Sequence, residues 1–89
     1  MTVEAEIRKR LEAELAPDVL DVVNESHLHA GHAGDDGTGE SHWRVRIVAR
    51  AFAGQGRIAR HRAVHAALGP EIMGRIHALA LDLKAPDEA

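Results

Sequence analysis

The chain has 89 residues, the size of one small domain with a modest core. Its 45% hydrophobic content excludes a disordered chain, and its lack of cysteine excludes both a disulfide framework and a metal site built from its own thiolates. The net charge of −3 argues against a general nucleic-acid binder. Its longest apolar run is far too short to cross a membrane, and its charged N-terminal residues lead us to expect no secretory signal. We therefore predict one domain over residues 1–89, located in the cytoplasm, with no membrane partner.

Charge is distributed unevenly along the chain. Residues 1–40 carry ten acidic and three basic side chains, whereas residues 41–70 carry six arginines and no acid. These arginines are Arg44, Arg46, Arg50, Arg57, Arg60 and Arg62. Two interpretations are open: the middle segment forms one basic face, or acids of the first helix neutralise it across the fold.

The first expected element is an amphipathic helix. Its apolar residues recur at every fourth position, at Val3, Ile7, Leu11 and Leu15. Thr2 is placed to cap its start, and Pro17 marks its end.

Two strands and a polar loop follow the helix. We expect the first strand over residues 18–26 and the second over residues 42–50. The second strand alternates, with Trp43, Val45, Ile47 and Ala49 directed one way and His42, Arg44, Arg46 and Arg50 the other. Because the loop between them is rich in glycine and aspartate, the two strands are predicted to form an antiparallel hairpin.

A second helix and a third strand complete the expected order. The helix begins at Arg57 and presents one face made of Ile58, His61, Val64, His65 and Leu68. Gly69 suits the position just after its end, and a short helical turn runs from Pro70 through Met73, closed by Gly74. The third strand is expected over residues 78–84, with alternating leucines, and Pro86 ends it.

These elements predict an α+β fold in the order helix, strand, strand, helix, short helix, strand, with both helices on one face of a three-stranded mixed sheet. The connection over residues 51–77 is long enough for a right-handed crossover, so the second and third strands should be parallel. The start of each then lies at the end of the sheet that carries the polar loop. Five of the seven histidines should approach that end, namely His29, His32, His42, His65 and His77.

Three segments carry a resemblance to a known family. "NESHLH", "FAGQGRIARHRAVHAAL" and "RIHALALDLKAP" resemble the BolA family, and the similarity extends over about residues 3–87. The ordered set of Arg60-His61-Arg62 and the later His77-Ala78-Leu79 is its most specific part. The resemblance implies a fold like the class II KH domain. It also implies a monothiol glutaredoxin as partner and a [2Fe-2S] cluster shared with that partner and its glutathione, with no cofactor in the isolated chain.

The resemblance further implies the cluster ligands. His77 matches the family's histidine ligand, and the second ligand, from the hairpin loop, falls on His29, with His27 and His32 as weaker alternatives. Imidazole can replace thiolate on one iron of a [2Fe-2S] centre, so a chain without cysteine can hold half of a cluster. For each histidine the simpler interpretation is structural: His77 as a half-buried strand residue, the others as solvated loop residues.

The expected function is therefore an adaptor in iron–sulfur trafficking or in iron, redox and stress regulation. The alternative is a DNA-binding transcriptional regulator of stress response and cell morphology, with duplex DNA on a basic surface made of Arg57, Arg60, Arg62 and Lys84. Against this alternative, Gly54 and Gly56 lie too close for a GxxG motif, and aromatic residues that could stack on bases are limited to Trp43 and Phe52. An enzyme is not expected, because no nucleophile or catalytic constellation is recognisable. His61 and His65 have a chelating spacing, but a buried or half-buried role is favoured over a zinc site.

Overall fold

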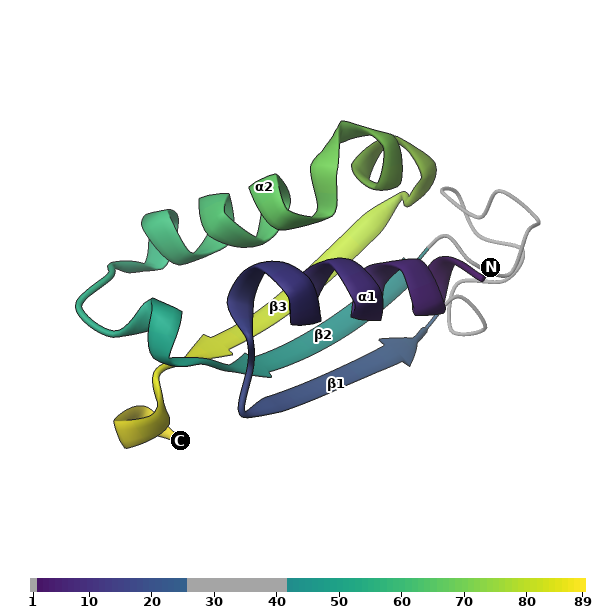
Figure 1. Cartoon of the computed structure of the whole chain (residues 1–89). Helices are drawn as coiled ribbons and strands as arrows, with labels where there is room; N and C mark the ends of the chain where they lie inside the picture. The colour runs from purple at the N-terminus through teal and green to yellow at the C-terminus, as the bar shows by residue number, and fades with distance from the viewer. Residues whose placement is uncertain (1, 26–41) are drawn as a thin grey trace.

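The chain folds as two helices over a three-stranded sheet (Figure 1). The computed structural model describes residues 2–25 and 42–89. The elements are α1 (Val3–Leu15), β1 (Val19–Asn24), β2 (His42–Val48), the 3-10 helix η2 (Arg50–Phe52), α2 (Arg57–Arg75), β3 (Ala78–Lys84) and the 3-10 helix η3 (Pro86–Glu88). This order confirms the predicted sequence of helices and strands, although β1 is shorter than expected and β2 ends before Arg50.

Helix α1 begins and ends as its sequence predicts. The Thr2 hydroxyl accepts a hydrogen bond from the Ala5 backbone N–H at 3.1 Å, which satisfies one of the free donors at the helix start. At the other end, Ala16 adopts a left-handed conformation with a φ of 44°, and its N–H donates to the Glu12 carbonyl. Pro17 then prevents the helix from continuing.

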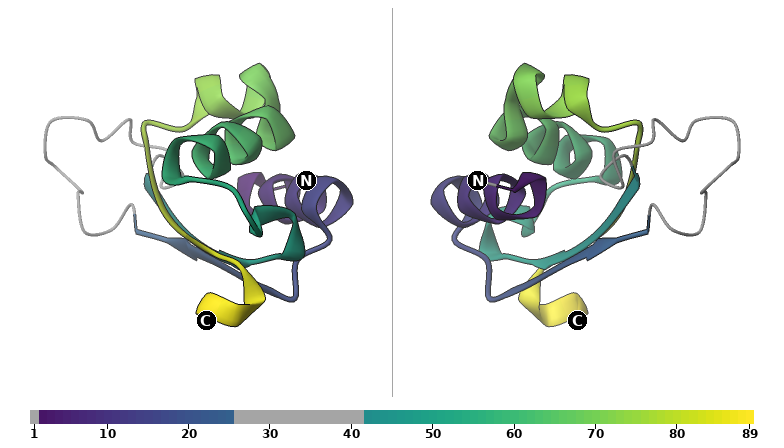
Figure 2. Two further views of the ribbon diagram at one scale, coloured as in Figure 1. Left: turned by 90° about the vertical axis from the view of Figure 1, so that its left-hand side faces the viewer. Right: turned by 90° about the vertical axis from the view of Figure 1, so that its right-hand side faces the viewer.

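The sheet has the strand order β1-β2-β3, with β2 in the centre. β1 pairs with β2 in antiparallel orientation, and β2 pairs with β3 in parallel orientation, so that Trp43 stands opposite Leu79. The parallel pair confirms the predicted crossover. Two views at right angles to the first show both helices on one side of the sheet (Figure 2).

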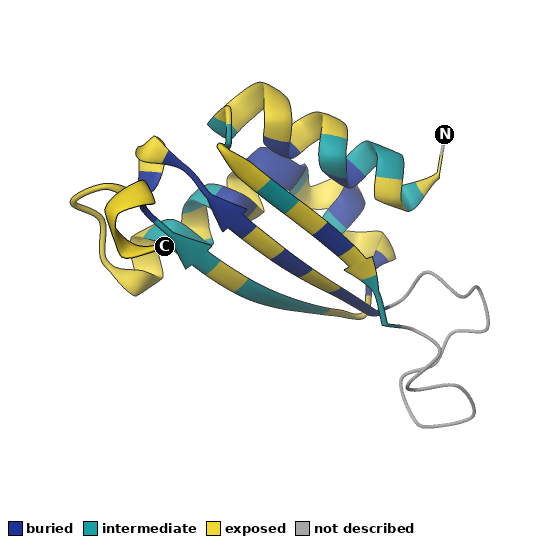
Figure 3. Ribbon diagram, turned by 90° about the horizontal axis from the view of Figure 1, so that it is seen from below, coloured by how far each residue is buried: buried dark blue, intermediate teal, exposed yellow. Residues whose placement is uncertain are grey.

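The core lies between the helices and the inner face of the sheet. Trp43, Val45 and Ile47 of β2 are almost fully buried, while Arg44 and Arg46 between them are exposed on the other face (Figure 3). The helices complete the core with Ile7, Leu11, Val64, Ala67, Leu68 and Ile72. The alternation of β2 is therefore confirmed over this stretch, but His42 is also buried, with 6% of its surface exposed, whereas the sequence had placed it on the solvent side.

Helix α2 differs from its prediction in two respects. Gly69 interrupts it, as expected, with a φ of 83° and a ψ of 163°, but the helix continues past Gly74 to Arg75. The predicted apolar face was also partly wrong. Ile58 is 68% exposed and His65 is exposed, whereas His61 is half-buried. The reason is that the buried residues of α2 begin only at Val64, so its first turns do not lie over the core.

Within residues 2–25 and 42–89, no helix is both long and apolar enough to cross a membrane.

Candidate functional site

Two of the five histidines expected to converge do lie together, where β2 and β3 begin. His42 opens β2 and is buried, while His77 immediately precedes β3 and is exposed. Their ring centroids are 5.4 Å apart, with the planes inclined at 47°. The parallel register explains this contact, because it sets His42 opposite Ala78, the residue that follows His77. This end of the sheet thus presents one accessible imidazole that packs against a buried one.

His27, His29 and His32 lie outside the described residues, so the assignment of a second ligand among them stays a prediction. His65 is exposed on α2 and is not part of the His42–His77 pair. In the described portion of the chain, no group of three or more His, Asp or Glu side chains is arranged to hold a metal ion.

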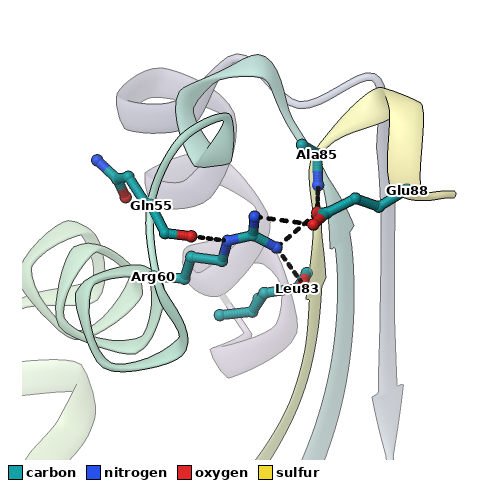
Figure 4. A network of polar contacts seen from close by, with 5 residues as sticks. All are labelled: Gln55, Arg60, Leu83, Ala85 and Glu88. Atoms are coloured by element: carbon teal, nitrogen blue, oxygen red, sulfur yellow. Dashed lines mark hydrogen bonds and ion pairs between the residues drawn. The ribbon is translucent and has the colours of Figure 1, made fainter.

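The opposite end of the sheet carries a network centred on Arg60 (Figure 4). Its Nη1 and Nη2 donate to the two carboxylate oxygens of Glu88 at 2.6 and 3.2 Å, and the Ala85 N–H donates to Glu88 Oε1 at 2.7 Å. Arg60 also donates to the carbonyls of Gln55 and Leu83. The hydrogen bond from Arg60 is the main reason that the pKa of the Glu88 carboxyl is lowered. Only 13% of the Arg60 side chain is exposed, so this residue of the predicted basic surface is paired within the chain itself.

Other arginines of the basic segment are neutralised, but not by the first helix. Arg44 pairs with Glu25 at 3.0 Å. Arg46 lies between Asp21 and Asp82, at 3.7 and 3.9 Å. These acids come from the strands beside β2 and from the residue after β1, because side chains directly across from each other on one face of a sheet are close neighbours. The ion pair that α1 does form across the fold joins Glu6 to Arg75 at 2.8 Å, outside the basic segment.

Three cations of the predicted basic surface are not paired with an acid in the described part of the chain, so their charges can act on a partner. Arg57 and Arg62 are exposed and Lys84 is half-buried, and none of them takes part in an ion pair between the residues that the structure describes. The two aromatic residues are not available for base stacking. Phe52 and Trp43 are 0% and 3% exposed, respectively, so contacts to bases would have to come from polar side chains.

The order of elements, with an antiparallel first pair of strands and a parallel second pair, defines a small α+β domain of the class II KH type. A family model described as BolA-like protein matches residues 11–88. The chain belongs to the BolA family.

Individual relatives support this assignment. The chain is 48% identical over 84 residues to mouse BolA-like protein 1, covering 94% of this chain and 58% of that protein, and thus less than two thirds of the mouse protein's length. It is 43% identical over 75 residues to a Vibrio cholerae protein described as DNA-binding transcriptional regulator BolA, covering 84% of this chain and 67% of that one. The solved structure of BolA1 from Arabidopsis thaliana superposes with a TM-score of 0.86 at 36% identity, covering 100% of this chain and 97% of that one.

Proposed function

We propose that this chain is an adaptor that binds a monothiol glutaredoxin and shares a [2Fe-2S] cluster with it, in iron–sulfur trafficking or in iron, redox and stress regulation. The observation that carries the proposal is the exposed His77 imidazole immediately before β3, which packs against the buried ring of His42. A ligand to a cluster shared between two proteins has to be accessible to the partner, and the exposed His77 imidazole meets this requirement.

The donor chemistry of this chain fits such a shared site. The chain has no cysteine, so it can contribute only nitrogen and oxygen donors of its own, and the thiolates would come from the glutaredoxin and its glutathione. Imidazole is an accepted ligand of [2Fe-2S] centres, where it raises the reduction potential relative to thiolate. His77 and, from the loop, His29 are the proposed ligands, with His27 and His32 as alternatives for the second position. The chain itself acts as a binding protein and not as an enzyme.

The test is to reconstitute the heterocomplex and change one histidine at a time. The chain is mixed with a monothiol glutaredoxin, iron, sulfide and glutathione, and visible absorption and circular dichroism are recorded. Replacement of His77 by alanine should change the visible dichroism, because an iron site loses its imidazole ligand. His61→Ala is the matched control, since His61 borders the groove beside Arg60 and Leu83, at the far end of β3. An unchanged spectrum with folded His77→Ala would rule out His77 as a ligand.

A second function has its own support. The Vibrio cholerae relative is described as a DNA-binding transcriptional regulator, and Arg57 and Arg62 are exposed here without an acidic partner in the described chain. These side chains suit contacts to phosphates, which fix position without reading sequence. Binding of the isolated chain to duplex DNA at several salt concentrations distinguishes this function from the adaptor, because a phosphate-based complex weakens steeply as salt increases.

A further inference from the structure

Three hydrogen-bond donors converge on one carboxylate at the far end of the sheet from His77. Arg60 Nη1 and the Ala85 N–H both donate to Glu88 Oε1, at 2.6 and 2.7 Å, and Arg60 Nη2 donates to Oε2 at 3.2 Å. The guanidinium and the backbone N–H together form an anion receptor that suits a group with two adjacent oxygens. Figure 4 shows that the carboxylate approaches from η3 while the guanidinium approaches from α2.

The receptor is held in place independently of Glu88. Arg60 Nε donates to the Gln55 carbonyl at 2.8 Å, and Nη1 donates to the Leu83 carbonyl at 3.2 Å. The guanidinium carbon also lies 6.0 Å from the centroid of the buried Phe52 ring, within the range of a cation–π contact. Because these contacts come from the turn before α2, from β3 and from the core, the guanidinium should keep its orientation when the Glu88 carboxylate leaves.

A groove of about 450 Å³ lies beside this receptor and is large enough for a small anionic ligand. Arg57 and His61 of α2 line it together with Arg60, and Asp82 and Glu88 supply its acidic groups. Asp82 lies 3.9 Å from Arg46, on the open face of the sheet. Arg57 has no ion-pair partner among the residues that the structure describes. If the Glu88 carboxylate moved away, Arg60 and Arg57 would make the groove cationic.

We propose that this groove is a binding site for a phosphate group, in which the Glu88 carboxylate occupies the ligand position as an internal competitor. A phosphate presents the same pair of oxygens to a guanidinium and a backbone N–H as a carboxylate does, with more negative charge. Arginine is the side chain best suited to such two-point recognition. Glu88 belongs to the three-residue helix η3, so only a short segment has to move for the exchange.

The internal carboxylate should weaken phosphate binding to the unaltered chain. A group tethered by a short segment competes at an effective concentration of about millimolar or more, so an external phosphate has to exceed it. Removing the negative charge of Glu88 should therefore tighten phosphate binding by about tenfold or more. The same change should not require any rearrangement of Arg60.

The test is a titration of the chain with inorganic phosphate, followed by isothermal calorimetry and by the NMR signals of the Ala85 N–H and the Arg60 Nε–H. The variant Glu88→Gln is compared with the unaltered chain, and Asp87→Asn is the control that removes an equal charge from the neighbouring position. Glu88→Gln should bind phosphate about tenfold more tightly, with both signals shifting. Asp87→Asn should gain much less, because the Asp87 charge acts on Arg60 only through space and does not occupy the ligand position. Adding Arg60→Gln to Glu88→Gln should abolish the gain.

A parallel titration with a short DNA duplex distinguishes the source of the phosphate. A gain with inorganic phosphate assigns the groove to free phosphate or a small phosphate ester. A gain confined to the duplex assigns it to the backbone of a nucleic acid. If Glu88→Gln remains folded and binds neither probe more tightly than the unaltered chain, the proposal is wrong, and the Arg60–Glu88 pair is then purely structural.

Discussion

Replacing Gly69 by alanine should destabilise the fold through the backbone alone. Gly69 has a φ of 83° and a ψ of 163°, a region that is essentially restricted to glycine. A Cβ built at this position meets no atom within 4 Å, so no steric contact adds to the cost. Holding alanine in this strained backbone conformation costs about 1–3 kcal/mol of folding free energy. The lower entropy of the unfolded alanine chain offsets about 0.4–1 kcal/mol of this cost. The midpoints of these ranges, about 2 and about 0.7 kcal/mol, give an expected loss of roughly 1.3 kcal/mol, or about 5–10 °C in Tm for a domain of this size.

Gly74→Ala is the matched control for this prediction. Gly74 lies inside α2, and a Cβ built there also meets nothing within 4 Å. Alanine is the better helix former by up to about 1 kcal/mol, so this variant should be more stable than the unaltered chain. Urea and thermal unfolding followed by circular dichroism measure both effects. If Gly69→Ala were as stable as the unaltered chain, or if both variants changed stability in the same direction, the assigned role of the Gly69 conformation would be refuted.

Two further predictions concern charge. Because Arg60 lowers the pKa of Glu88, the ion pair contributes stability above the ordinary carboxyl pKa of about 4.3 and loses it as the pH falls through the lowered folded value. The Tm of Glu88→Gln should therefore lie below that of the unaltered chain at neutral pH, and the two should converge in strong acid; a constant difference would contradict this. For DNA, the double variant Arg57→Ala and Arg62→Ala should weaken duplex binding for all sequences and reduce the slope of log affinity against log salt concentration by about 2. The double variant Arg44→Ala and Arg46→Ala should change this slope little, because it removes arginines that are already paired with acids. Equal effects of the two pairs would show that the binding surface lies elsewhere.

The backbone fold could be predicted because its determinants are local. Period-four apolar residues predicted α1, alternation predicted β2, and the connection after β2 was long enough for a crossover to a parallel third strand. Gly69 was recognised as a break because its conformation is available to glycine but not to most other residues. These signals can all be read along one continuous stretch of chain, so a single sequence is enough to recognise them.

The side-chain environment at the sheet ends could not be predicted in the same way. Arg60 and Glu88 are 28 residues apart, and no periodicity connects them; only the turn after β3 brings η3 beneath the first turns of α2. Ile58 follows the apolar pattern of its helix, yet it is 68% exposed because that part of α2 extends beyond the core. His42 was assigned to solvent by alternation, but it is 6% exposed and its ring contacts that of His77, which precedes the neighbouring strand. Each of these side-chain environments depends on how elements distant in sequence are placed relative to one another.

The parallel pairing of β2 and β3 also separates the two kinds of chemistry in the molecule. His42 and His77 lie where these strands begin, whereas the Arg60–Glu88 pair lies where β3 ends. Seven-residue strands place the two ends about 20 Å apart, well beyond the range over which side-chain changes usually couple. A glutaredoxin at the histidine end and a phosphate group at the arginine end would therefore contact different residues of the same rigid sheet. This separation is why a variant at one end can serve as a control for the other, and why loss of cluster binding in His77→Ala should leave phosphate binding by Glu88→Gln intact.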